Sequence, residues 1–117
     1  MEKLLSMLCS CIGIAGSETN AAQVAAKELS KYADVKIDKN NNVIAVLGNK
    51  DSNKHIMLDA HIDQIGLVVT NITEGGFLKV APCGGIDSRI MPGSTVKIHG
   101  KNDITGIVSS IPPHLSN

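Results

Sequence analysis

The chain has 117 residues, which fits one domain of ordinary size, and its 11 Lys and Arg residues balance 11 Asp and Glu residues. The zero net charge leaves no basic excess that would bind nucleic acid or an anionic membrane surface. One Tyr, one Phe and no Trp offer little surface for stacking on bases, so the core must be built from aliphatic side chains.

The first 16 residues predict an amphipathic helix rather than a secretory signal. Glu2, Ser6 and Ser10 interrupt the apolar run. The apolar residues instead recur at the three- and four-residue spacing of one helix face, and they are Leu4, Leu5, Leu8, Cys11 and Ile12. No stretch reaches the roughly 18 apolar residues that a membrane span needs, so we expect no membrane partner.

The three cysteines, Cys9, Cys11 and Cys83, form no CxxC pair. An odd number of cysteines without metal-ligand spacing is typical of reduced thiols in a cytoplasmic protein. A cysteine-based enzyme is one interpretation of Cys83, because Gly84 and Gly85 beside it could donate backbone hydrogen bonds. We favour the alternative that Cys83 is a small apolar residue in a glycine turn.

A second helix and a β-hairpin are predicted next. Ser17 is suited to cap a helix, and a stripe of small residues then continues to a predicted helix end near Tyr32. Apolar residues at 35–37 and 43–47 flank the sequence DKNNN. Asn tolerates left-handed backbone angles and bonds its own backbone, so this sequence predicts a turn between two strands.

A third strand is predicted to begin at residues 55–58, whose nearly continuous apolar character is typical of a strand covered on both faces. Helices followed by such strands indicate an α/β layer architecture. From residue 65 the pattern changes to short strands separated by Gly and Pro turns, at 65–72, 77–80, 95–98 and 104–108. Such strands indicate a small β-barrel. We therefore predict an α/β part over residues 1–64 and a partial β-barrel over residues 65–117.

The most polar strand end is the sequence DAHIDQIG at residues 59–66. Residues two apart share a face of a strand, so Asp59, His61 and Asp63 should lie in a row. One imidazole nitrogen can donate to a neighbouring carboxylate, which leaves the other nitrogen free to bind a metal or to take a proton. A structural, hydrogen-bonded His beside solvated turn acids is the alternative, and the octapeptide alone does not exclude it.

The other histidines are poorly placed to complete a metal site, which for zinc needs at least three protein ligands. His55 heads the same strand, about 20 Å from His61 at roughly 3.3 Å per residue. His99 follows a predicted strand at a turn, and His114 follows two prolines with a role that stays open. The ligand set is therefore incomplete within this chain.

Residues 58–93 read LDAHIDQIGLVVTNITEGGFLKVAPCGGIDSRIMPG. With the sequence GIAGSE at 13–18 and PPHL at 112–115, this stretch resembles metallopeptidase family 42. That family comprises the tetrahedral aminopeptidases and relatives labelled glutamyl aminopeptidase, deblocking aminopeptidase or endoglucanase. The similarity runs in order along essentially the whole chain.

The resemblance implies a metal-dependent aminopeptidase that removes N-terminal residues from peptide substrates with two divalent metal ions, zinc or cobalt. The implied fold is the N-terminal part of an α/β/α-layer zinc aminopeptidase catalytic domain, followed by part of a small inserted β-barrel domain. That β domain would mediate dimerisation and assembly of the homo-oligomer into a dodecamer. His61 matches the first metal ligand, and Asp63 matches the catalytic acid that supports it.

Two departures from the family stand out. Family members usually carry Glu at the position of Gln64, so we expect altered polar contacts there. Family chains are also about three times longer, and their remaining metal ligands and general base lie after the β domain. We therefore interpret the chain as the N-terminal third of such an enzyme, which alone should be inactive and should not bind metal tightly.

The alternative function is a non-catalytic assembly or oligomerisation module. Strand edges that an incomplete β-barrel leaves open favour pairing with another chain.

Overall fold

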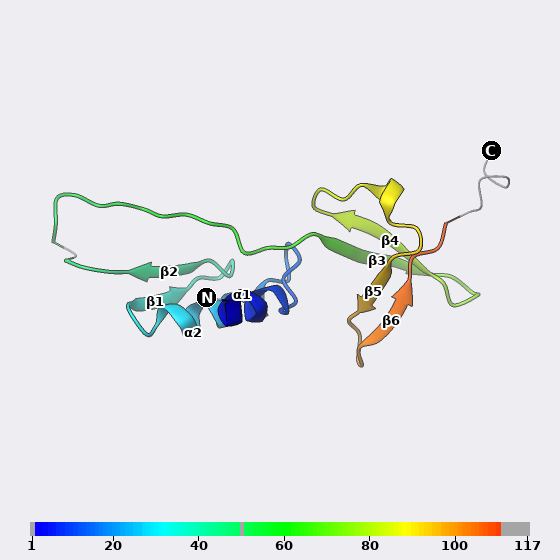
Figure 1. The fold of residues 1–117 in the computed structure, drawn as a ribbon, viewed down its shortest axis with the longest axis horizontal. Helices are drawn as coiled ribbons and strands as arrows, with labels where there is room; N and C mark the ends of the chain where they lie inside the picture. The colour runs from blue at the N-terminus through cyan, green and yellow to red at the C-terminus, as the bar shows by residue number, and fades with distance from the viewer. Residues whose placement is uncertain (1, 50, 111–117) are drawn as a thin grey trace. The chain divides into compact units, whose positions relative to one another are not determined.

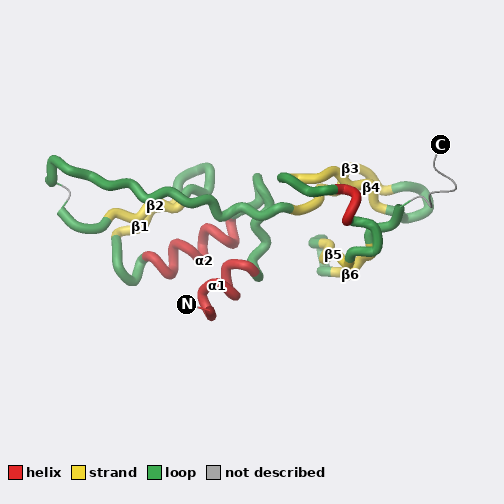
Figure 2. Tube along the Cα trace, turned by 45° about the horizontal axis from the view of Figure 1, so that its top comes forward, coloured by secondary structure: helices red, strands yellow, loops and turns green. Residues whose placement is uncertain are grey.

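The computed structural model describes residues 2–49 and 51–110 (Figure 1). It divides into two compact units, Met1–Gly84 and Gly85–Asn117. The first unit is mixed α/β and contains α1 (Glu2–Cys9), α2 (Thr19–Leu29), β1 (Asp34–Ile37), β2 (Val43–Val46), β3 (Gly66–Ile72) and β4 (Leu78–Cys83). The second unit contains the short 3-10 helix η1 (Ser88–Ile90) and the strands β5 (Thr95–Ile98) and β6 (Ile104–Ile107), which Figure 2 distinguishes by colour. The PPHL sequence with His114 lies outside the described residues.

Both predicted helices form, with bounds that differ from the prediction. α1 ends at Cys9, so the last two residues of the predicted apolar face follow the helix instead of extending it. α2 begins at Thr19 with Glu18, not Ser17, at its N-cap, and it ends three residues before Tyr32. In the described ranges, no helix has both the length and the hydrophobicity needed to cross a membrane.

The small side chains of α2 allow it to pack closely on its neighbours. Ala21 and Ala22 are 1% and 0% exposed, and α2 contacts α1, β1 and β2. A helix carrying alanines on one face can approach a sheet closely, and the contacts of α2 with β1 and β2 agree with the predicted packing of a small-residue helix against a sheet.

The β1–β2 hairpin confirms the predicted turn and the left-handed Asn within it, but Asp38 rather than an Asn side chain bonds the turn backbone. β1 and β2 pair antiparallel, with Ile37 opposite Val43. Between them, Asn41 adopts a left-handed φ of 64°. The Asp38 carboxylate accepts the backbone N–H groups of Asn40 and Asn42 at 2.8 and 2.9 Å. The Asn42 side chain is the main cause of the lowered pKa of Asp38.

The prediction of a third strand beginning at residues 55–58 is wrong. Residues 55–60 form no β-ladder, and their backbone groups make no hydrogen bond with any other described residue. Ile56, Met57 and Leu58 are 91%, 87% and 94% exposed, and Figure 1 draws this stretch as a long extended connection without an arrow. Apolar runs indicate a covered strand only where neighbouring strands exist, and none pairs with residues 55–60 within the described part of the chain.

The later strands form two antiparallel hairpins. β3 pairs antiparallel with β4, and Gly76 supplies the positive φ at their turn, whereas Gly75 does not. β5 pairs antiparallel with β6. Among the residues described, the strands form three separate two-stranded sheets. The β-barrel and the domain boundary between residues 64 and 65 both remain predictions.

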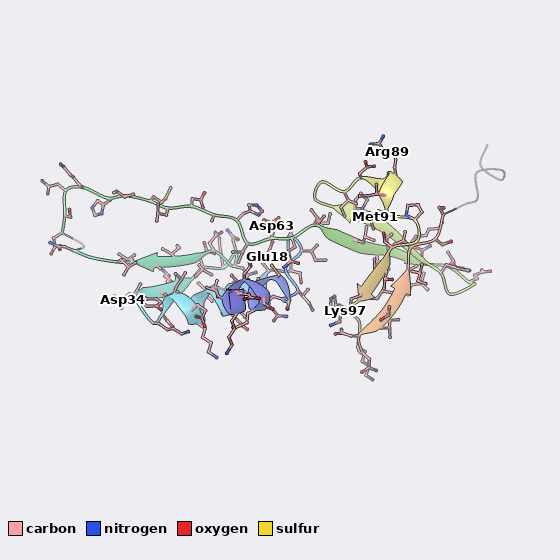
Figure 3. All side chains as sticks on the ribbon, viewed as in Figure 1. Glu18, Asp34, Asp63, Arg89, Met91 and Lys97 are labelled. Atoms are coloured by element: carbon pink, nitrogen blue, oxygen red, sulfur yellow. The ribbon has the colours of Figure 1, made fainter. Side chains whose placement is uncertain are left out.

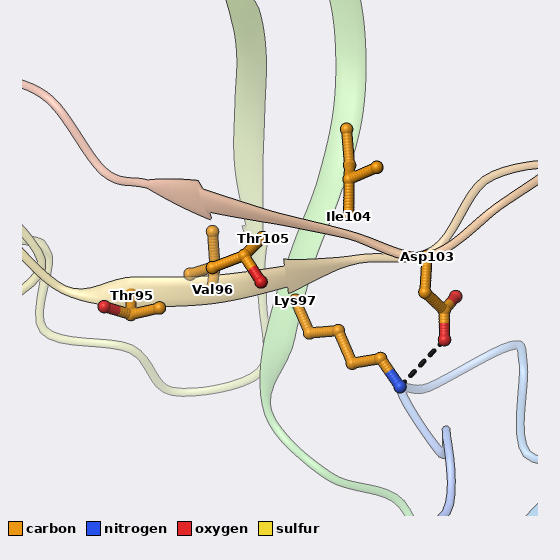
Figure 4. Close-up of a pocket in the computed structure, with 6 residues that line it drawn as sticks. All are labelled: Thr95, Val96, Lys97, Asp103, Ile104 and Thr105. Carbon is orange, nitrogen blue, oxygen red and sulfur yellow. Dashed lines mark ion pairs between the residues drawn. The ribbon is translucent and has the colours of Figure 1, made fainter.

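Asp103, directly before β6, pairs with Lys97 of β5 and with His99 in the turn between the two strands. Asp103 lies 2.8 Å from the Lys97 Nζ and 2.9 Å from the His99 Nδ1. Figure 4 shows the Lys97–Asp103 ion pair at an open cavity of about 330 Å³ that both residues help to line. The hydrogen bond from Lys97, and next that from His99, lowers the pKa of Asp103.

The lowered pKa of Asp103 makes the hairpin sensitive to acid. A group whose pKa is lower in the folded state stabilises that state above its unfolded pKa, which is about 4 for Asp, and this stabilisation is lost as the pH falls further. We expect cross-strand NMR signals of β5–β6 to stay constant from about pH 7 to pH 5 and to weaken towards pH 3. In D103N these signals should be weaker at neutral pH and should not respond over this range. If the cross-strand signals of D103N weakened towards pH 3 as much as those of the unchanged chain, Asp103 would not be the group that makes the hairpin sensitive to acid.

Candidate functional site

The predicted contact between His61 and Asp63 forms on the extended segment between β2 and β3. The His61 Nδ1 lies 3.0 Å from the Asp63 Oδ1, and Figure 3 labels Asp63 at this point of the chain. An ionised carboxylate can only accept hydrogen bonds, so Nδ1 must carry the proton in this contact. The Nε2 of neutral His61 is then left with its lone pair, and the side chain is 85% exposed.

A short junction holds the carboxyl end of this segment against the N-terminal region. The Gln64 N–H donates to the Gly13 carbonyl at 2.6 Å, and Gln64 forms an isolated parallel bridge with Ile14. A side chain at Gly13 would lie 3.3 Å from the Cβ of Ala21 in the buried face of α2. Gly13 and Ile14 were not predicted as part of the site, because nothing in the sequence links them to residues so far along the chain as His61.

The remaining predicted residues do not join the pair. Asp59 and His55 are exposed and contact no other described residue through hydrogen bonds or ion pairs. His99 lies in the second unit, bonded to Asp103. No group of three or more His, Cys, Asp or Glu side chains that could hold a metal occurs within residues 2–49 and 51–110. His61 offers one nitrogen donor of the kind that zinc binds, which falls short of a complete site.

Cys83 lies at the end of β4, and its thiol is 3.8 Å from the Ala15 carbonyl. Gly84 follows with a φ of 84°. In the described part of the chain, no imidazole contacts the Cys83 thiol to activate it. This environment supports the interpretation of Cys83 as a small residue in a glycine turn.

Comparison with known proteins identifies the family. Residues 41–117 match the sequence profile of the M42 glutamyl aminopeptidases. The chain belongs to the M42 family. It is 34% identical over 116 residues to the lysyl aminopeptidase of Pyrococcus furiosus, an alignment that covers 97% of this chain and 33% of that protein.

Two solved M42-type structures share the fold of the chain. The TET aminopeptidase of the marine sediment archaeon Thaumarchaeota archaeon SCGC AB-539-E09 matches with a TM-score of 0.87 and 27% identity, over 99% of this chain and 33% of that one. The TET1 peptidase of Pyrococcus horikoshii, which can assemble into a tetrahedron or a large octahedral shell, matches with a TM-score of 0.81 and 34% identity. This second match covers 98% of this chain and 34% of the other. The chain therefore spans about a third of the length of its M42 relatives.

The junction at Gln64 leaves no room for a side chain at position 66. A Cβ at Gly66 would overlap the Cγ2 of Ile14, whereas a Cβ at Gly75 would meet nothing closer than the Phe77 ring at 3.5 Å. We expect Gly66→Ala to weaken the junction by about 1–3 kcal/mol, as overpacking usually does, and Gly75→Ala to leave it intact. The protection of the Gln64 backbone amide from hydrogen exchange measures this effect.

Adding Ile14→Ala to Gly66→Ala removes the overlapping methyl group, so the double variant should recover part of the lost protection. Equal protection of the Gln64 amide in the Gly66→Ala and Gly75→Ala variants would show that the junction does not form as described.

Proposed function

We propose that this chain provides the first metal ligand, His61, and its supporting acid, Asp63, to a metal-dependent aminopeptidase that removes N-terminal residues from peptides. The observation that carries the proposal is the 3.0 Å contact between the His61 Nδ1 and the Asp63 Oδ1. A carboxylate that holds one ring nitrogen fixes the tautomer and directs the lone pair of the other nitrogen outward, which is the usual arrangement of a metal-binding His. Membership of the M42 family supports the reaction class.

The metal centre that we propose would hold two divalent ions, zinc or cobalt, of which His61 binds one. When bound, such ions polarise a peptide carbonyl and lower the pKa of a bound water. In this chain, Asp63 holds and orients the His61 side chain that would bind the metal. The residues described here offer no third ligand near His61, so we expect the other ligands and the general base from segments that the longer relatives contain.

The assembly of the enzyme is a further part of the proposal. We expect a homo-oligomer in which a β domain formed from residues 65–117 pairs two subunits and builds a dodecamer. Pyrococcus horikoshii TET1, which is 34% identical, can assemble into a tetrahedron or a large octahedral shell, and this supports the proposal. We place this assembly in the cytoplasm, because Cys9, Cys11 and Cys83 are all free thiols.

The second candidate function is a non-catalytic assembly module. It is favoured by apolar side chains that the β3–β4 hairpin exposes: Val68, Val69, Ile72, Phe77 and Val80 are between 42% and 71% exposed. Exposed apolar groups of this kind on a hairpin favour association with another protein surface.

Metal and activity measurements on the chain test the first candidate. We expect weak zinc binding in a calorimetric titration, because one imidazole is a poor site, and no release of N-terminal residues with added zinc or cobalt. The weak binding should disappear in His61→Ala and persist in His55→Ala, since His55 is exposed on the same segment without a carboxylate partner. Peptidase turnover that follows the chain through purification would contradict the predicted lack of activity.

The catalytic role of His61 requires the rest of an M42 chain. In a chimera that replaces the corresponding third of the Pyrococcus furiosus lysyl aminopeptidase with this chain, we expect aminopeptidase activity. His61→Ala should lower kcat by roughly 100-fold or more, and His55→Ala should not. Equal activity of the two variants would refute His61 as a metal ligand.

Sizing chromatography separates the two candidates. Metal-free oligomers with no zinc binding would favour the assembly module, whereas zinc uptake that depends on His61 would favour the enzyme site.

A further inference from the structure

We propose that Gln64 is a positioning residue, whose side-chain amide fastens the His61–Asp63 pair to the carboxyl end of α1. This inference rests on the proposed function only in taking His61 as the metal ligand. The contacts between Gln64 and residues 8–14 do not depend on that function.

Gln64 bonds the N-terminal region through both its side chain and its backbone. Its Nε2 donates to the Leu8 carbonyl and to the Cys11 carbonyl, each at 3.3 Å. Its backbone N–H donates to the Gly13 carbonyl at 2.6 Å. One residue therefore binds three carbonyl groups, in the last turn of α1 and in the chain that follows it.

The chemistry of these contacts suits an amide. The last carbonyls of a helix carry the partial negative charge of its carboxyl end. The Leu8 carbonyl also accepts the backbone N–H of Cys11 at 3.2 Å, and its second lone pair remains for the Gln64 amide. A primary amide has two N–H groups and so can donate to two carbonyls at once. An ionised carboxylate at position 64 has no proton to donate, and the carbonyl oxygens would repel it. Gln64 is half-buried, so a lost donor there would not be fully replaced by water.

The fastening matters for His61 because the segment before it lacks other anchors. Residues 55–60 make no hydrogen bond to any described residue. Asp63 directly precedes Gln64, and the His61 ring is held by the Asp63 carboxylate. Rotation of the chain at residue 64 would turn that carboxylate, and the imidazole with it, away from a fixed direction.

The two glutamines of the chain allow an internal comparison without any substitution. Gln23 is exposed on α2, and its side chain hydrogen-bonds no described residue. We expect the side-chain amide protons of Gln64 to exchange with water about tenfold more slowly than those of Gln23 in ¹H–¹⁵N spectra of the full chain. Equal exchange rates would overturn the proposal.

A matched pair of variants tests the positioning role. Gln64→Met keeps the length and bulk of the side chain without its donors, and Gln23→Met makes the same change at the exposed site. We expect Gln64→Met to reduce the fraction of neutral His61 that carries its proton on Nδ1, as read from the ring ¹⁵N shifts, and Gln23→Met to leave it unchanged. A purely structural role for Gln64 would lower stability without moving this tautomer ratio, and that result would also overturn the proposal.

The two proposals fail in different measurements. Absence of zinc binding by His61 contradicts the proposed function, while a protected Gln64 amide and a shifted His61 tautomer in Gln64→Met would still support the fastening. If Gln64→Met does not fold, the exchange comparison between Gln64 and Gln23 decides the question alone.

Discussion

The backbone hydrogen bond from Gln64 to the Gly13 carbonyl is the constraint on which the candidate site depends. It joins a segment with few other contacts to the part of the chain that packs on α2. Gly13 permits this approach because it has no side chain to displace Ala21. Gly66 likewise has no side chain that would overlap the side chain of Ile14. Two small residues thus allow two distant stretches of sequence to meet at backbone distance.

The junction holds in place a pair of side chains whose contact with each other is local. His61 and Asp63 face each other across one intervening residue, and the carboxylate determines which ring nitrogen carries the proton. The pair alone prepares a ligand and nothing more, because the described residues gather no second or third metal-binding side chain around it. The M42 relatives are three times as long, so the proposed enzyme places its remaining machinery in segments that this chain does not match.

Local sequence patterns predicted the features that local chemistry controls. The DKNNN turn formed as expected because Asn41 adopts the left-handed φ and the Asp38 carboxylate accepts the backbone N–H groups of Asn40 and Asn42. The His61–Asp63 contact also formed although the predicted strand did not, since an extended backbone suffices to bring two such side chains together. The third strand failed because an apolar run shows that residues 55–58 favour burial but not which chain covers them. The contacts of Gln64 with Leu8 and Cys11 span more than fifty residues, and no periodicity in the sequence encodes such a distance.

The most direct test of this account is the tautomer of the neutral His61 ring, read from a long-range ¹H–¹⁵N spectrum of the chain at alkaline pH. We predict a protonated Nδ1 and a bare Nε2 for His61, since Asp63 can only accept. A ring with its proton on Nε2, or with both tautomers equally populated, would contradict the prediction that Asp63 prepares His61 to bind a metal.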